Sequence, residues 1–396
     1  MRCALTRFSW LGMMKRKKGE TKRMPLRKYL SLGKRWVLER CNLLLKAVFS
    51  RLPIQNRVFF YSIRADGKLL ENSQCVYDAL GNVQKVVVAR MLPHPVLLKP
   101  KIYYYLLTSR VIVTDDYLRY LRHTKLRAGQ KVVQIWHACG AFKRFGLDAP
   151  SLLTPQEERL THCQYTAVCV SSEQVRPFYA QAFGIDIARV LPLGTPRTDA
   201  LLRDQTRSAL REELLTRRPE MRGKRIYLYT PTFREQNGKP CAYDPQINWE
   251  ALDDALADDE LFVIRRHPIM KESFLGGRSF RHIVDATREP TQALLTVASL
   301  VVTDYSSVIY DALLCGLPLV FYCPDLNAYE RDFYLSYPQD LPGPTVLCAE
   351  KLLGVLREAC AHPPFEQLAV FRAAQLGACD GRASERVAQL ICGYLQ

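Results

Sequence analysis

Two histidines at the ends of short apolar runs have the side chain best suited to proton transfer near neutral pH. His137 ends the run VVQIWH and precedes the small-residue turn ACGA, and His267 ends the run FVIRRH. An unperturbed imidazole titrates near pH 6.5 and can act as a general base. A turn of small residues also lets a substrate approach His137 closely. A hydrogen-bonded structural histidine is the plain alternative for His137.

Anion-binding side chains cluster beside His267 and after two other apolar runs. Arg265 and Arg266 precede His267, and two guanidiniums beside an imidazole form a natural anion site, although surface arginines at a strand end would look the same. The clusters LYTPTFRE and VVTDYSS supply the hydroxyl, guanidinium and carboxylate groups of Thr232, Arg234, Asp304, Ser306 and Ser307. These groups can hold phosphate oxygens, or they can cap a helix and close a loop.

The apolar runs predict the elements that position these side chains. Six β-rich runs occupy the first half (RVFFYSI, KVVVARM, RVIVTD, KVVQIWH, YTAVCVSS, RVLPLG) and five the second (RIYLYTPT, LFVIRRHP, RHIVDA, LVVTDYSS, PLVFYC). Apolar strands that alternate with helical stretches predict parallel sheets covered on both faces. Because the carboxyl ends of such strands meet at one edge, we expect the polar clusters to face a common cleft.

The length of the chain predicts two domains. A chain of 396 residues exceeds what one hydrophobic core usually holds. The polar stretch 203–224 separates the two sets of strands. We therefore predict an α/β fold with a basic segment at residues 1–55, an N-terminal Rossmann-like domain at 56–205 and a C-terminal Rossmann-like domain at 206–396.

The positive charge is concentrated at the start of the chain. The net charge is +17, and the first 57 residues hold sixteen Lys or Arg against two acidic residues. Between Leu26 and Leu52 the apolar residues recur at helical spacing. This composition indicates a helix on an anionic membrane surface, where each basic residue adds about 1 kcal/mol of attraction. A helix packed on its own domain is the alternative, and nucleic acid is disfavoured because aromatic and Gly-rich binding patterns are missing.

Several function classes lack their sequence signatures. No apolar window of about 18 residues predicts a membrane span. Arg7 interrupts the apolar start ahead of KRKK, which argues against a cleaved signal peptide. Thirteen scattered cysteines without a CxxC pair indicate reduced thiols in a cytoplasmic protein. The absence of GxxxxGK[ST], GxGxxG and HExxH motifs disfavours P-loop NTPases, dinucleotide dehydrogenases and tightly bound catalytic metals, and no cofactor is expected.

The order of the clusters resembles that of the CDP-glycerol glycerophosphotransferases of bacterial teichoic-acid synthesis. The resemblance covers residues 130–395 and rests on QIWHACGAFKRFG, LPLGTPRTDALL, YTPTFRE, RRHP, TDYSSVIYDALLCGLPLVFYCPDL and DGRASERV. One departure is WHACG in place of the WHGTP of many members. Any role of that threonine therefore does not carry over to this chain.

The resemblance implies a fold, a reaction and a location. The fold would be GT-B-like, with two Rossmann-type domains facing a cleft. The donor would be CDP-glycerol, or CDP-ribitol as in relatives, and its polyol phosphate would pass to a hydroxyl of a lipid-linked cell-wall acceptor with release of CMP. Residues 56–205 would then serve the acceptor and residues 206–396 the donor. Members are peripheral on the cytoplasmic face of the cell membrane, which fits the basic helix.

The resemblance also implies roles for the candidate side chains. The two histidines that the family needs for activity match His137 and His267. We expect His137 to act as general base while the acceptor hydroxyl attacks the β-phosphorus. Asp304 would order its turn. His267 and Arg266 would stabilise the diphosphate of the donor, and Ser306 and Ser307 would hold its oxygens. Thr232 and Arg234 would lie near the donor.

Two other functions remain open from the sequence. A nucleotide-sugar glycosyltransferase would share the two-domain cleft, and the choice of donor would distinguish it. A membrane scaffold or nucleic-acid binder would explain the basic front end, but not histidines at two strand ends.

Overall fold

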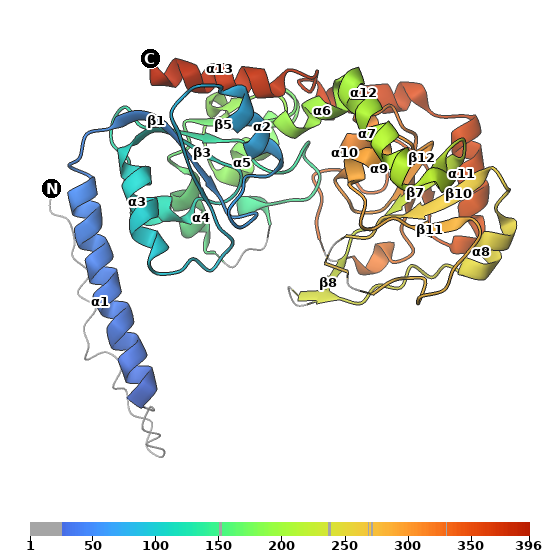
Figure 1. Ribbon diagram of the computed structural model, residues 1–396, viewed down its shortest axis with the longest axis horizontal. Helices are drawn as coiled ribbons and strands as arrows, with labels where there is room; N and C mark the ends of the chain where they lie inside the picture. Colours follow the sequence, from blue (N-terminus) through green and yellow to red (C-terminus); the bar gives the residue numbers. More distant parts are fainter. Residues whose placement is uncertain (1–25, 150–152, 237–238, 268, 271, 330) are drawn as a thin grey trace.

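Two parallel six-stranded sheets form the framework of the chain (Figure 1). The computed structural model describes residues 26–149, 153–236, 239–267, 269–270, 272–329 and 331–396. The first sheet has the order β2-β1-β3-β4-β5-β6. Its strands are β1 (Gln55–Ser62), β2 (Lys85–Ala89), β3 (Ser109–Thr114), β4 (Lys131–Gln134), β5 (Ala167–Cys169) and β6 (Val190–Leu191).

The second sheet has the order β11-β10-β7-β12-β13-β14. Its strands are β7 (Arg225–Thr230), β10 (Glu260–Ile264), β11 (Ile283–Asp285), β12 (Leu300–Thr303), β13 (Leu319–Tyr322) and β14 (Thr345–Val346). Numbered within its own domain this order is 3-2-1-4-5-6, which is that of a Rossmann sheet. The expected α/β fold with two Rossmann-type domains is confirmed.

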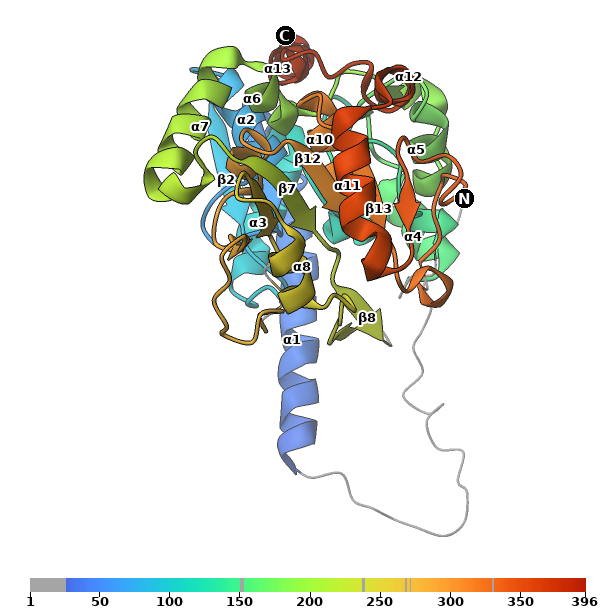
Figure 2. The same cartoon turned by 90° about the vertical axis from the view of Figure 1, so that its right-hand side faces the viewer.

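Helices follow the strands and cover both sheets (Figures 1 and 2). In the first half they are α1 (Leu26–Phe49), α2 (Glu71–Ala79), α3 (Leu98–Thr108), α4 (Pro155–His162), α5 (Arg176–Phe183), α6 (Asp199–Leu202) and α7 (Asp204–Arg217). In the second half they are α8 (Trp249–Ala255), α9 (Thr291–Leu295), α10 (Val308–Leu314), α11 (Leu352–Ala361), α12 (Phe365–Leu376) and α13 (Ala383–Leu395).

Each sheet is buried on both faces because the central residues of its strands form continuous apolar runs. In β1, Phe59 belongs to the core on one face and Phe60 to the core on the other. In β7, Leu228 likewise belongs to the core on one face of the second sheet and Tyr229 to the core on the other. Alternate side chains of a strand point to opposite faces, so a continuous apolar run needs helices on both sides. The rigid sheets thereby fix the strand ends that carry the polar clusters.

The C-terminal helix α13 returns to the first domain. Val387 and Ile391 pack in the same core as Phe60 of β1. The carboxylate of Asp199 accepts hydrogen bonds from the backbone N–H groups of Ala383 and Ser384, at 3.0 and 2.8 Å, and so caps the start of α13. Residues 383–395, which the sequence analysis assigned to the C-terminal domain, therefore pack against the first sheet.

Helix α1 projects away from both sheets and contacts the first domain near its C-terminal end (Figures 1 and 2). Phe49 packs against Tyr104 of α3 with ring centroids 5.5 Å apart, and the ammonium of Lys46 donates to the carbonyl of His123 at 2.6 Å. Leu44 and Val48 are 69% and 55% exposed. Residues 1–25 of the predicted basic segment lie outside the described residues. The structure therefore does not bear on the prediction that they are not a cleaved signal peptide.

The described elements agree with most of the sequence expectations. Each of the eleven predicted β-rich runs contains a strand. The sequence analysis missed the hairpin β8 (Arg234–Gln236) and β9 (Lys239–Cys241) and the two-residue strand β14, because these segments are too short or too polar to show an apolar pattern. Among the described helices, none has the length and hydropathy needed to cross a bilayer.

Candidate active site

The hydroxyl and carboxylate clusters of the second domain lie where the strand order of its sheet reverses. The neighbouring strands β7 and β12 end at Thr230 and Thr303. The hydroxyl of Thr303 donates to the carbonyl of Thr230 at 2.9 Å and ties the two strand ends together. Sheets of this kind bind ligands outside the carboxyl ends of the strands at the point of reversal.

Asp304 joins the loops that follow β7 and β12. One of its carboxylate oxygens accepts the backbone N–H of Thr232 at 2.8 Å and that of Tyr305 at 2.6 Å. The other oxygen lies 2.9 Å from the guanidinium of Arg234. Asp304 is fully buried, and a buried carboxylate needs such partners. The carboxylate therefore fixes the positions of Thr232 and Arg234 relative to β12.

The charge of Arg234 is compensated within the protein. Its guanidinium donates to both carboxylate oxygens of Asp325, at 2.6 and 3.0 Å, in addition to its contact with Asp304. It also lies 3.9 Å from the centroid of the Tyr243 ring. Two carboxylates face one guanidinium, so Arg234 has no net positive charge to offer a phosphate.

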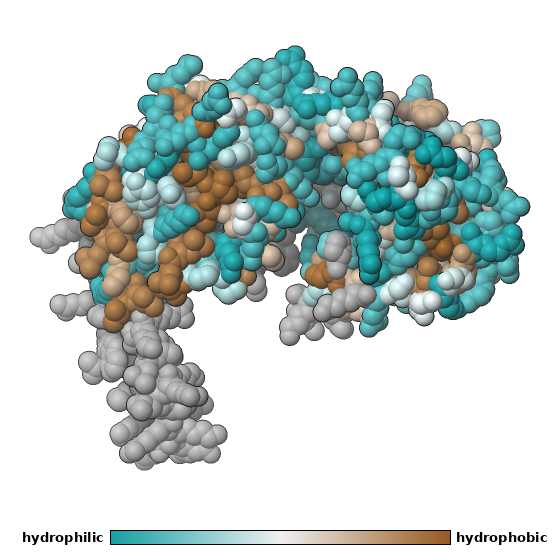
Figure 3. All heavy atoms as spheres, in the orientation of Figure 1, coloured by the Kyte–Doolittle hydropathy of each residue, from teal (hydrophilic) through white to brown (hydrophobic). Residues whose placement is uncertain are grey.

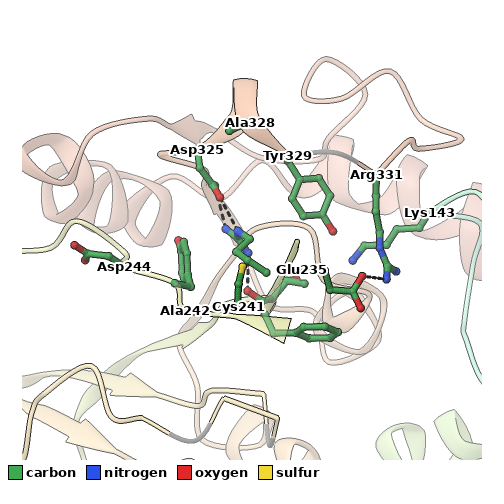
Figure 4. A pocket seen from close by; sticks show the side chains of 13 residues that line it. Lys143, Glu235, Cys241, Ala242, Asp244, Asp325, Ala328, Tyr329 and Arg331 are labelled. Atoms are coloured by element: carbon green, nitrogen blue, oxygen red, sulfur yellow. Dashed lines mark hydrogen bonds and ion pairs between the residues drawn. The ribbon is translucent and has the colours of Figure 1, made fainter. Parts of the chain in front are cut away.

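A cavity of about 410 Å³ opens beside this network (Figure 4). Its volume is in the range of small-molecule sites. Thr232 and Arg234 line it, together with Tyr243 and Tyr329 of the second domain. Lys143 of the first domain also lines it, so the cavity lies between the two domains. Figure 3 shows the hollow between the two lobes on this face.

His137 follows β4 of the first sheet, and its ring reaches the residues after β3, the strand that adjoins β1 where the strand order reverses. Its Nδ1 is 3.1 Å from the carbonyl oxygen of Asp115 and 3.6 Å from the carboxylate of Asp116. With only acceptors around Nδ1, we assign the proton of the neutral ring to Nδ1, which leaves Nε2 as an acceptor. Burial lowers the pKa of His137, and the negative charge of Asp116 opposes this effect.

The backbone before His137 is held in a strained conformation. Trp136 has a φ of +46°, in the left-handed region that is unfavourable for a bulky residue. Its N–H donates to the side chain of Gln134 at 2.8 Å, and its carbonyl accepts from Asn72 at 2.9 Å. Its ring stacks on that of His137 with centroids 4.4 Å apart. These contacts hold the imidazole in place.

The small-residue turn after His137 serves a contact between the domains. Gly140 has a φ of +65°, and a Cβ at this position would lie 2.2 Å from the ring of Tyr310 in α10. Cys139 and Ala141 are buried. The expectation that the small turn lets a substrate approach is therefore wrong for these three residues, because the space is filled by the second domain.

His267 has the opposite arrangement of ring nitrogens. The backbone N–H of Ile269 donates to its Nδ1 at 3.3 Å. The proton of the neutral ring therefore belongs on Nε2, which has no hydrogen-bond partner among the described residues. The ring packs on Phe233 with centroids 4.8 Å apart, and Phe233 lines the cavity. Burial lowers the pKa of His267, and the charges of Arg265 and Lys143 lower it further.

The two arginines before His267 have different surroundings. The guanidinium of Arg266 lies 3.0 Å from the carboxylate of Asp285 and donates to the carbonyls of Met270 and Glu272. Arg265 has no ion pair among the described residues, and its guanidinium donates only to the carbonyl of Arg266, at 3.2 Å. Arg266 therefore supports the loop that carries His267, whereas Arg265 has donor capacity to spare.

Ser306 and Ser307 lie at the start of α10, next to Asp304. The hydroxyl of Ser306 accepts the N–H of Val308 at 3.3 Å, while Ser307 is exposed and makes no capping bond with its side chain. Neither serine lines the cavity. The structure thus brings Thr232, Arg234 and Asp304 into one network, with His267 packed beside it, and places His137 on the facing domain.

Several residues around these sites were given no role by the sequence analysis. They are Asp116, Lys143, Asp325, Tyr243 and Arg331. Asp116 follows the apolar run RVIVTD and could have been found by the rule that polar residues at strand ends share an edge. The others lie in loops, whose folding the sequence pattern does not indicate. Among the described residues, no group of three or more His, Cys, Asp or Glu is placed to hold a metal ion.

A family model described as CDP-Glycerol:Poly(glycerophosphate) glycerophosphotransferase matches residues 45–393. The chain belongs to this family. The expected family membership is confirmed, and the match extends well beyond the residues on which the resemblance rested. It includes both sheets and most of the returning helix α13.

Relatives of known function within the family differ in length. The teichoic acid poly(ribitol-phosphate) polymerase of Bacillus spizizenii is 34% identical over 73% of this chain and 47% of its own length. The ribitol-phosphate primase of the same organism is 32% identical over 74% of this chain and 77% of its own. The glycerol-phosphate primase of Bacillus subtilis is 26% identical over 75% of this chain and 77% of its own length. The chain spans about half the length of the polymerases that it matches.

The fold resembles that of a solved wall teichoic acid polymerase. The wall teichoic acid polymerase TagF superposes with a TM-score of 0.74 at 19% sequence identity, over 93% of this chain and 97% of the solved chain. The expected GT-B-like arrangement is confirmed by this likeness. At this identity the likeness concerns the fold alone.

Proposed function

We propose that the protein transfers the polyol phosphate of a CDP-polyol to a hydroxyl of a teichoic acid acceptor and releases CMP. One observation carries the proposal beyond family membership. Both histidines present Nε2, but with opposite hydrogen-bonding roles: among the described residues Nε2 of His137 is a free acceptor, and Nε2 of His267 carries a free donor proton. A phosphotransfer needs one group of each kind, a base for the nucleophile and a donor for the phosphate.

His137 then acts on the acceptor and His267 on the donor. Nε2 of His137 takes the proton of the acceptor hydroxyl while the oxygen of that hydroxyl attacks the β-phosphorus. The Nδ1–H of His137 stays directed at Asp115 and Asp116. The bond from the β-phosphorus to the bridging oxygen breaks, and CMP leaves with that oxygen. His267 donates Nε2–H to the phosphate oxygens on which charge develops.

The remaining side chains of the second domain hold the donor indirectly or directly. Arg234 and Asp304 stabilise the wall of the cavity. Arg234 forms ion pairs with Asp304 and Asp325, so its charge is compensated within the protein. We assign the guanidinium beside the diphosphate to Arg265. The sequence analysis assigned it to Arg266, but that side chain is paired with Asp285 and hydrogen-bonded to the loop that carries His267. The hydroxyls of Thr232, Ser306 and Ser307 stay candidates for hydrogen bonds to the donor.

The polyol of the donor is either glycerol or ribitol. Among the relatives, those named for ribitol phosphate are 32–34% identical to this chain, and those named for glycerol phosphate are 26–30% identical. This difference favours CDP-ribitol over the CDP-glycerol that the sequence analysis placed first.

The first domain carries the surface that we assign to the membrane. Large apolar side chains are exposed on α1 at Val37, Leu44 and Val48, and on the loop before α3 at Leu97, which is 90% exposed. Figure 3 shows apolar side chains gathered on this lobe. Exposed apolar patches beside basic residues suit the interface of an anionic bilayer. The enzyme would act there as a peripheral protein of the cytoplasmic face, on a lipid-linked acceptor.

Purified full-length protein should be given CDP-ribitol, CDP-glycerol and a sugar nucleotide in parallel, with a synthetic lipid-linked acceptor. We expect CMP and an acceptor enlarged by one or more polyol phosphates, with the faster rate from CDP-ribitol. Mass analysis of the product gives the number of units added. Turnover of the sugar nucleotide alone would overturn the proposal in favour of glycosyl transfer.

A further inference from the structure

Lys143 reaches from the first domain into the cavity of the second. Two backbone hydrogen bonds of 2.8 and 3.0 Å join residues 142–144 of the first domain to residues 332–334 of the second. Lys143 and Phe333 form the bridge at the centre of this pairing. The side chain of Lys143 consequently lines the cavity beside Tyr329 and Arg331 (Figure 4).

Among the residues that the structure describes, the ammonium of Lys143 has no anionic partner. Among the described residues its side chain makes no hydrogen bond or ion pair, and its ammonium lies 5.4 Å from the centroid of the Tyr329 ring. The nearby carboxylate of Glu235 is paired with Arg331. Burial, and then the charge of Arg331, lower the pKa of Lys143 to about 8. A largely buried cation without a partner is costly unless a ligand supplies the opposite charge.

We propose that Lys143 binds the transferred phosphate, which is the β-phosphate of the CDP-polyol donor. The inference rests on the proposed function and assigns one ligand within its site. Lys143 follows His137 by six residues on the same domain and projects across the domain boundary. The phosphate at that boundary is the one that an acceptor activated by His137 must attack. The α-phosphate remains with the departing CMP.

This position gives Lys143 two effects on the reaction. Its charge neutralises the phosphate that receives the nucleophile, as cationic side chains do in other phosphoryl transfers. Its contact also links the domains through the ligand, because the donor of the second domain then touches the first. The charged groups that face the ammonium are Arg331, Arg234, Asp304, Glu235 and, from the RRHP loop, His267.

Calorimetric titration of the full-length protein with CDP and with CMP tests the assignment. Charge-assisted hydrogen bonds are worth about 1.5–3 kcal/mol, so Lys143→Met should weaken CDP binding by about 10- to 100-fold. CMP binding should change little, because CMP lacks the β-phosphate. Arg144→Lys is the matched control, since Arg144 is exposed, lies on the same paired segment and donates from its side chain to the carbonyl of Phe333, a contact that lysine can keep. It should leave the affinity for CDP unchanged.

A conservative variant separates a phosphate ligand from a structural residue. At pH 8, wild-type protein should take up part of a proton when CDP binds, which titrations in Tris and in HEPES would show as different apparent enthalpies. Lys143→Arg should restore most of the CDP affinity but abolish the proton uptake, because a guanidinium stays charged at this pH.

The possible results distinguish this inference from the proposed function. If wild-type protein binds CDP and turns over a CDP-polyol while Lys143→Met does both equally well, only the role of Lys143 is wrong. Equal losses for CDP and CMP would also overturn it, because they would indicate a damaged cavity. If wild-type protein neither binds CDP nor turns over a CDP-polyol, the proposed function itself fails.

Discussion

The carboxylate of Asp116 lies 3.6 Å from Nδ1 of His137. This contact and the Asp115 carbonyl at 3.1 Å orient the imidazole so that Nε2 faces away from them. In the proposed reaction Asp116 acts through His137 and does not touch the substrate.

Replacing Asp116 by Asn should change both the rate and its pH dependence. The negative charge of Asp116 raises the pKa of His137, so its removal lowers that pKa. The reaction needs neutral His137, and the acidic limb of the kcat/KM profile should therefore move to lower pH. The plateau rate should fall by about 10- to 100-fold, because the ring loses orientation. A rate profile measured from pH 5 to 9 checks both effects, and an unchanged acidic limb would contradict them.

His267 should be replaceable in part by another N–H donor. Loss of a donor to a developing oxyanion costs about 10²- to 10³-fold in kcat, which is the effect expected for His267→Ala. His267→Gln keeps an N–H donor and should recover about tenfold of that loss. Steady-state kinetics with saturating donor give both values. Equal activity of the two variants would show that donation is not the role of His267.

Arg234→Ala should destabilise the fold. Removal of one partner from a buried ion pair costs about 3–5 kcal/mol, because the carboxylate of Asp304 stays buried without its cation. Thermal unfolding should show a clear loss of stability for Arg234→Ala and a smaller one for Asp325→Asn, whose oxygens are partly exposed. A stable Arg234→Ala variant with weak donor binding would mean instead that Arg234 binds the donor.

Negative charges on the exposed side of α1 should weaken membrane attachment without reducing catalysis. The double variant Leu44→Glu and Val48→Glu places two carboxylates on exposed positions and should reduce sedimentation with anionic vesicles by about tenfold or more. Activity on a water-soluble acceptor should persist. Leu44→Ala with Val48→Ala controls for helix formation. Unchanged vesicle binding of the charged variant would place the attachment elsewhere on the chain.

Much of the fold could be predicted because its strands are continuous apolar runs. Segments such as RVFFYS and RIYLYT are buried on both faces, and this pattern survives in the sequence whatever the neighbouring strands are. The order of the strands could not be predicted in the same way. Nor could the return of α13 to the first sheet, which depends on long-range contacts such as those of Asp199 with Ala383 and Ser384.

The chemistry of the site was only partly predictable. Histidines at two strand ends suggested proton transfer, but whether Nε2 of each ring accepts or donates depends on Asp116 and on the N–H of Ile269. Arg266 and Arg265 are indistinguishable in sequence, and the contact with Asp285 separates them. Lys143 enters the cavity because segment 142–144 pairs with a distant loop, and no local pattern indicates that pairing.

The central claim is that His137 is the base of a CDP-polyol phosphotransfer. Its most direct test is the rate of CMP release from CDP-ribitol and CDP-glycerol by the full-length protein and by His137→Ala, at pH 7.5 with a lipid-linked acceptor. We predict CMP release by the wild-type protein and a loss of about 10²-fold or more in the variant. Near-normal CMP release by a folded His137→Ala protein would contradict the account.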